Sequence, residues 1–139
     1  MYRKCFLVGA ALIAFLSACA LPGQSIYPNG QKAMISELLY FGTTTPGGIV
    51  IGEDWQGFLN QSVTPQFPGG LSIWPASGQW KLTTSPIIRE ASYVLNIIHE
   101  GNITTSAVLD EIVRTYKTQF QQDAVLRVRE ATSVSFIVS

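Results

Sequence analysis

An apolar stripe with helical spacing between Thr105 and Phe120 is the feature that most constrains how this chain can fold. The stripe recurs at intervals of three and four residues, which predicts an amphipathic helix with one buried side. Asp110 and Glu111 lie early in it and Lys117 lies late, as the helix dipole favours. Its members are Leu109, Ile112, Val113, Tyr116 and Phe120. Because such a helix gains most of its stability from packing, the rest of the chain must supply a partner layer.

A second helical pattern precedes it between Gly52 and Val63. The apolar residues Trp55, Phe58, Leu59 and Val63 fall at i, i+3, i+4 and i+8. We therefore expect a helix that ends by Pro65.

Two β-prone segments flank this first helix. The run from Ile35 to Phe41 is closed by Gly42 and a polar loop, and it predicts the first strand. The segment 71–74 predicts a short strand, followed by a turn at residues 76–78. Pro75 restricts this strand to a sheet edge or a strand end, because proline cannot donate to the ladder.

The longest apolar stretch of the domain runs from Ile87 to Ile98. Its odd-numbered residues form one buried face of a central strand, and its β-branched content favours that interpretation. The same stretch also fits helical spacing through Ala91, Val94, Leu95 and Ile98, so both assignments stay open. A last strand is expected from Ala124 to Val128, and a period-two pattern recurs at residues 133–138.

The expected order is strand, helix, strand, strand, helix, strand. This is the order of the ferredoxin-like split βαβ, an α+β fold in which two helices cover one face of a four-stranded antiparallel sheet. The length of 139 residues suits one hydrophobic core. We expect a single domain over residues 33–139.

The N-terminal residues have the layout of a signal peptide. Arg3 and Lys4 precede an uncharged, mostly apolar run over residues 5–21, with no positive stop after it. The stretch Leu16-Ser17-Ala18-Cys19 resembles the lipobox of bacterial lipoproteins. The resemblance implies that residues 1–18 are removed and that Cys19 becomes lipidated. The alternatives are an ordinary secretory leader, in which Cys19 is incidental, and a permanent membrane anchor.

Residues 19–32 are rich in proline, glycine and polar side chains, which predicts a flexible tether behind the lipid. Ala20 follows Cys19, and in envelope lipoproteins the lack of aspartate there favours the outer membrane. We therefore expect a bacterial envelope protein anchored by lipid and facing the periplasm.

Composition excludes several classes of protein. Apolar residues make up 47% of the chain and charged residues 13%, so the domain is folded and weakly charged. Loss of Arg3 and Lys4 with the leader leaves seven basic residues against nine acidic ones, which argues against a nucleic-acid partner. The two cysteines, Cys5 and Cys19, both lie in the leader region, so no disulfide is expected in the domain.

Several motifs resemble one bacterial family. They are Glu37-Leu38-Leu39-Tyr40-Phe41-Gly42, Val63-Thr64-Pro65-Gln66-Phe67-Pro68-Gly69-Gly70-Leu71, Gly78-Gln79-Trp80 and Val125-Leu126-Arg127-Val128. Over residues 35–128 the chain resembles the family known as domain of unknown function 3574. The family often has an arginine at the position of Gln66 and an aspartate at that of Gly69. The resemblance implies no reaction, cofactor or partner.

The candidate site residues lie on the predicted sheet. Glu37, Glu90, Ser92 and Asn96 are expected on the face opposite the helices, where they can bind a ligand or a second copy, or form a solvated surface. Paired carboxylates there can support acid–base chemistry if burial raises one pKa. The single histidine, His99, is expected at the surface at a strand end. It lacks the partners for a zinc site, and we expect no metal and no cofactor.

Two other patterns have structural explanations. Trp74 and Trp80 with Phe67 can form an aromatic ligand platform, but they fit core and edge packing better. Glycines 47, 48, 69 and 70 follow prolines and lack the context of a phosphate loop, so they indicate turns.

No catalytic motif is found, so a binding or assembly module fits the sequence best. Its expected partners are the membrane, through lipid on Cys19, and a second copy or another envelope protein. The alternative is a small ferredoxin-like enzyme or small-molecule-binding protein that uses Glu37, Glu90 or His99.

Overall fold

The computed structural model describes residues 30–81 and 83–137. The leader, Cys19 and most of the expected tether lie outside the described residues. The predictions on signal cleavage and lipidation therefore stay predictions.

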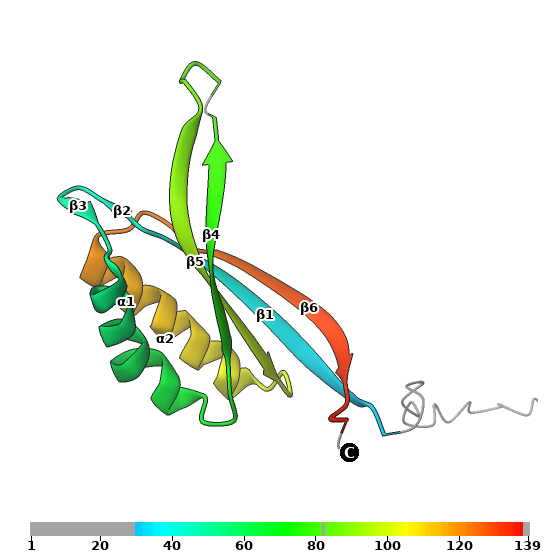
Figure 1. The fold of residues 1–139 in the computed structure, drawn as a ribbon. Coiled ribbons are helices and arrows are strands. Elements are labelled where there is room, and N and C mark those ends of the chain that lie inside the picture. The colour runs from blue at the N-terminus through cyan, green and yellow to red at the C-terminus, as the bar shows by residue number, and fades with distance from the viewer. Residues whose placement is uncertain (1–29, 82, 138–139) are drawn as a thin grey trace, which may run out of the picture.

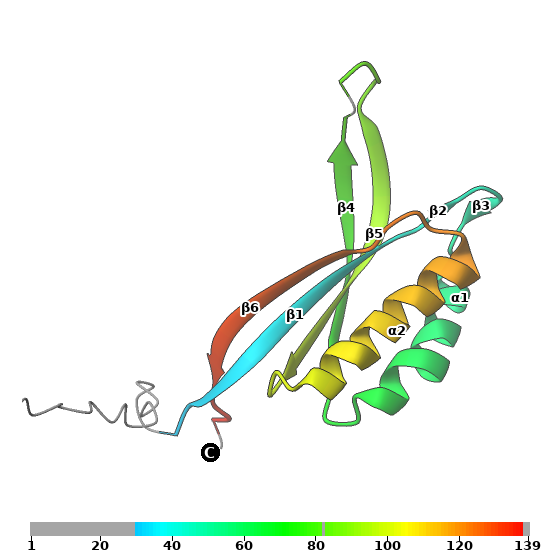
Figure 2. The ribbon, with the colours of Figure 1, turned by 180° about the vertical axis from the view of Figure 1, so that it is seen from behind.

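Four strands form one antiparallel sheet with the order β4-β5-β1-β6. These strands are β1 (Lys32–Gly42), β4 (Ser72–Trp80), β5 (Ile88–His99) and β6 (Leu126–Val134). The helices α1 (Gly52–Phe58) and α2 (Ile103–Phe120) cover the same face of the sheet (Figure 1), and Figure 2 shows the arrangement from behind. The predicted α+β ferredoxin-like fold is confirmed. A small hairpin of β2 (Thr44–Thr45) and β3 (Gly48–Ile49) links β1 to α1.

The β4–β5 hairpin is longer than the sequence predicts. The turn expected at residues 76–78 is wrong, because β4 continues through these residues and pairs with β5 as far as Trp80 and Ile88. Pro75 is tolerated because β4 is an edge strand that needs no ladder bond on its outer side. Since β1 ends at Gly42, opposite Ser92, the two strands extend beyond the sheet as an arm (Figure 1). We call residues 76–81 and 83–92 the β4–β5 arm.

The first helix has its predicted extent but not one geometry. It is α-helical to Phe58, continues as a π-helical turn (Leu59–Val63) and ends in a 3-10 turn (Thr64–Gln66). Pro65 cannot donate an α-helical hydrogen bond, so the α-helix cannot continue through it. All four residues of the predicted stripe are buried nonetheless: Trp55, Phe58, Leu59 and Val63.

The second helix begins two residues earlier than predicted, because Asn102 caps it. The Asn102 side chain accepts a hydrogen bond from the Thr105 amide at 2.8 Å. The helix ends where Gln121 adopts the left-handed conformation, with φ 53°. The central strand over residues 87–98 is confirmed, and the helical alternative for this stretch is wrong. The last strand extends to Val134, and residues 135–137 lie outside it.

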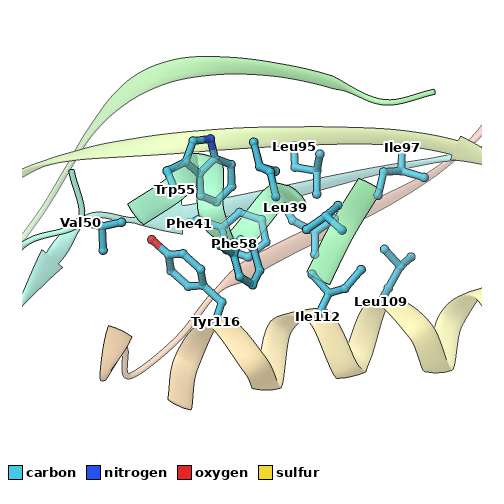
Figure 3. Packing of buried hydrophobic residues seen from close by; sticks show 12 residues of the cluster. Leu39, Phe41, Val50, Trp55, Phe58, Leu95, Ile97, Leu109, Ile112 and Tyr116 are labelled. Atoms are coloured by element: carbon cyan, nitrogen blue, oxygen red, sulfur yellow. The ribbon is translucent and has the colours of Figure 1, made fainter. Parts of the chain in front are cut away.

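The core fills the space between the sheet and the two helices (Figure 3). Its aromatic centre is tightly packed: Trp55 stacks on Tyr93 at 4.6 Å between ring centroids, and Phe41 meets Tyr116 edge-on at 4.7 Å. The Tyr116 hydroxyl donates to the Gly42 carbonyl at 2.8 Å. Burial raises the pKa of Tyr116, and the negative charge of Glu90 raises it further. This hydroxyl therefore stays protonated and joins α2 to the end of β1.

Candidate functional site

The strand register divides the sheet side chains between two faces. Leu39 and Phe41 of β1 are fully buried under the helices, and side chains alternate along a strand. Glu37 therefore lies on the helix-covered face with them. The expectation that Glu37 faces away from the helices is wrong. Glu37 lies two residues before Leu39 and four before Phe41, so its side chain shares their face of the strand.

Glu37 is the centre of a buried ion cluster. It has no exposed surface, and both of its carboxylate oxygens accept hydrogen bonds from Arg127, at 2.9 Å from Nε and 2.8 Å from Nη2. Arg129 Nη1 lies 3.5 Å from Glu37 Oε1. The outer nitrogen of Arg127, Nη1, donates to Asp110 on α2 at 2.7 Å. The cluster thus ties together β1, β6 and α2.

His99 lies beside this cluster and is only 7% exposed, so the expectation of a surface histidine is wrong. Its Nδ1 accepts a hydrogen bond from the Gly101 amide at 2.9 Å, which places the proton of the neutral ring on Nε2. Nε2 lies 3.5 Å from Glu37 Oε1, which is too long for a strong hydrogen bond. The His99 ring therefore packs beside the Glu37 carboxylate without a short hydrogen bond to it.

The surroundings of Glu37 keep its carboxylate ionised. Hydrogen bonds from Arg127 hold the pKa of Glu37 below its ordinary value, although burial acts in the opposite direction. A general acid at neutral pH needs a raised pKa. Glu37 is accordingly an ionised partner of Arg127, and its lowered pKa argues against a role as a general acid.

The other three predicted site residues lie on the face away from the helices, which we call the open face. Glu90, Ser92 and Asn96 occupy even positions of β5, opposite in phase to the buried Leu95 and Ile97. Ser36 donates to Asn96 at 3.1 Å, and Glu90 accepts from the Thr44 amide at 3.0 Å. They are spread along the strand and do not meet Glu37. Their role in binding stays a prediction.

The centre of the open face is uncharged and mostly apolar. Two complete rows of cross-strand neighbours run across all four strands, and side chains in one row share a face. One row contains Trp74, Val94, Tyr40 and Leu126, and the next contains Ser72, Asn96, Leu38 and Val128. Trp74 is 41% exposed and Leu126 is 60% exposed. Apart from Ser72 and Asn96, the side chains of the two rows are apolar or aromatic, whereas a solvated sheet face carries mainly polar side chains.

Strand β6 shows the same preference most clearly. Leu126 and Val128 point to the open face, whereas Arg127 and Arg129 point to the helix-covered face. Arg127 is largely buried in the ion cluster, whereas Leu126 on the opposite side of the strand is 60% exposed. Sequence reasoning missed Arg127, Arg129 and Asp110. The alternation of residues 126–129 was a readable signal, but it does not say which side the helices cover.

The aromatic residues do not form one platform. Phe67 packs against the helix-side core, whereas Trp74 and Trp80 lie on the open face, six residues apart along β4. Among the described residues, no group of three potential metal ligands is found, and no helix is long and apolar enough to cross a bilayer.

The fold is similar to that of two solved structures of a phage SAM lyase. The complex with S-methyl-5'-thioadenosine has a TM-score of 0.52 at 11% identity, over 74% of this chain and 90% of that chain. The apo state has a TM-score of 0.52 at 13% identity, over 84% and 99%. At these identities the likeness concerns the fold alone. No curated protein matches this chain. The model of a family described as a protein of unknown function, DUF3574, matches residues 36–136, and the chain belongs to that family.

Proposed function

We propose that this protein is a lipid-anchored protein of the bacterial cell envelope whose domain assembles with a second copy through the open face. The observation that carries the proposal is the apolar centre of that face, above all the outward Leu126 and Val128 of β6. The lipid on Cys19 would hold the assembly at the outer membrane, on the periplasmic side.

The free energy favours covering this face. Burial of apolar surface contributes about 25 cal/mol for each Å² removed from water. Trp74, Leu126 and Ile98 lie on the open face and are each more than 40% exposed. A monomer leaves their apolar surface in water and lacks the stabilisation that burial of this surface would give. Monomeric proteins rarely leave an apolar patch of more than a few hundred Å² in contact with water.

The size of the face suits a stable dimer. Four strands spaced about 4.8 Å apart, each with about nine residues that rise 3.3 Å, give a face of roughly 19 by 30 Å. Side-chain relief raises the accessible area above this flat value. A standard interface buries about 800 Å² on each partner, which is of the same order as the area of this face.

A second copy is the partner that the chemistry of the face fits best. In a two-fold dimer the same patch meets itself, so any charge at its centre would meet a like charge. Both central rows lack ionised side chains, and the charged residues of the face, such as Glu90 and Glu130, lie outside them. Attachment to one membrane surface would also raise the effective concentration of the copies.

Cysteine cross-linking of the full chain in intact bacteria tests the proposal. Ser72→Cys and Thr132→Cys place thiols on the open face, and Thr118→Cys places a control thiol on the exposed side of α2. With a short bismaleimide, we expect a dimer-sized product from Ser72→Cys or Thr132→Cys and only background from Thr118→Cys. Adding Trp74→Glu should abolish the product. Equal cross-linking of the Ser72→Cys, Thr132→Cys and Thr118→Cys variants would contradict the proposal.

A further inference from the structure

A hollow of about 530 Å³ lies in the angle between the β4–β5 arm and the loops at the end of the sheet. The arm contributes Trp80, Ile88 and Glu90. The β2–β3 turn contributes Pro46, and the loop between α2 and β6 contributes Asp123. We propose that this hollow binds a small organic cation of the alkylammonium class, with Trp80 against its cationic head and with Glu90 and Asp123 supplying the counter-charge.

The charged side chains that line the hollow all have one sign. Its described lining includes two carboxylates and no lysine, arginine or histidine. Arg89 of the arm is the cross-strand neighbour of Gln79. The Arg89 side chain therefore lies on the opposite face of the hairpin from Trp80 and Glu90. A cleft lined with one sign of charge attracts ligands of the other sign. The preferred ligand is therefore a cation.

The C-terminus of α2 adds to this preference. This helix of 18 residues ends at Phe120, and Gln121 and Gln122, which follow it, line the hollow. The helix dipole places roughly half a negative charge at this end, which favours a cation. Lys117 is the basic residue of the last turn, and it lines a different hollow.

Glu90 is held in place at the wall of the hollow. One of its oxygens accepts the Thr44 amide at 3.0 Å, and the carboxylate lies over Gly42, where an added Cβ would be only 2.6 Å from Oε1. A carboxylate can accept several further hydrogen bonds or an ion pair. The chain thus presents a positioned anion rather than a flexible one.

Trp80 supplies the surface that distinguishes an organic cation from a metal ion. Its side chain is 49% exposed although it is one of the largest apolar groups in the chain. Tryptophan attracts alkylammonium groups most strongly among the aromatic side chains, because the negative face of the indole meets the positive head. Ile88, its cross-strand neighbour, and Pro46 offer apolar contacts to the alkyl part.

Calorimetry with choline and its neutral isostere 3,3-dimethylbutan-1-ol tests the inference on the full chain in detergent. The two probes have the same shape and differ in charge. We expect choline to bind, the neutral probe not to bind, and added salt to weaken choline binding. Trp80→Leu should weaken binding by roughly 5- to 30-fold. Glu90→Gln, which keeps an acceptor for Thr44, should weaken it by at least about fivefold.

Two variants on the helices serve as controls. Glu53→Gln and Glu111→Gln each remove one exposed carboxylate outside the hollow, and both should leave choline affinity unchanged. Equal binding of the neutral probe, no choline binding at millimolar concentration, or an equal loss in the controls would overturn the inference.

Discussion

At the scale of single residues, Glu37 shows how a charge can occupy a core position. Its place two residues before Leu39 assigns it to the helix-covered face, and its complete burial would be costly without Arg127. The alternation of β1 made the location of Glu37 predictable. Its partner was not predictable, because Arg127 lies ninety residues away and meets Glu37 only through the pairing of β1 with β6.

Removing Arg127 should therefore destabilise the domain strongly. Arg127→Met removes both short hydrogen bonds of the buried carboxylate and leaves it only the longer ion pair with Arg129, so the free energy of unfolding at pH 7 should fall by about 3 kcal/mol in denaturant titrations. Arg114→Met is the control, because Arg114 pairs with Glu111 on the exposed surface of α2 and its loss should cost less than about 1 kcal/mol. Equal losses in the two variants would contradict a stabilising role for the ion cluster.

The same pair sets a pH dependence with a definite sign. The folded pKa of Glu37 lies below its unfolded value near 4.5, so the unfolded state binds the proton more readily. The stabilisation is present above that value and is lost as the pH falls through the lowered folded pKa. The free energy of unfolding should consequently fall less with decreasing pH in Arg127→Met than in the wild type.

At the scale of elements, the helices were predictable and the edge strands less so. The stripe of α2 fixes its buried side, and only its start moved, to Ile103, because Asn102 caps it. The small residues 76–78 resemble a turn, but continuous pairing with β5 keeps them in β4. Local sequence could not show this pairing. Small residues of this kind fit a strand or a turn, and the pairing with a distant segment decides between the two.

The assignment of the buried side of α2 can be tested by substituting Ile112 and its exposed neighbour Glu111. Ile112 is 2% exposed, whereas Glu111 lies on the outer side of the helix. Ile112→Asp should unfold the domain, since an unpaired buried charge costs several kcal/mol against a total stability of about 5–15 kcal/mol. Glu111→Gln should shift the melting temperature little. Circular dichroism melts of both variants measure this, and similar melting curves would show that the buried side of α2 is assigned wrongly.

At the scale of the whole molecule, the open face and the lipid anchor together define the proposed role. The sequence predicted four strands and two helices, and with them a face that no helix covers. It could not show that this face is apolar at its centre, because the register of β6 determines which of its side chains point there. The arm and its hollow depend likewise on the unforeseen length of β4.

The anchor is tested by the mass of the mature N-terminus. Full-length protein expressed in a bacterium should fractionate with the membrane, and mass spectrometry should find acylated Cys19 with residues 1–18 removed. Cys19→Ala should leave an unacylated protein. Detection of an intact Met1, or of cleavage that leaves a free Cys19 thiol, would refute lipidation and leave the fold unaffected.

The central claim is that two copies meet through the open face, and the mass of the particle in solution tests it most directly. Analytical ultracentrifugation of the detergent-extracted full chain should give twice the mass of one chain. Trp74→Glu should give a single chain, whereas Thr118→Glu, on the exposed side of α2, should remain a dimer. Circular dichroism would establish that both variants are folded. A wild type of single-chain mass, or a folded Trp74→Glu that still forms the dimer, would contradict the account.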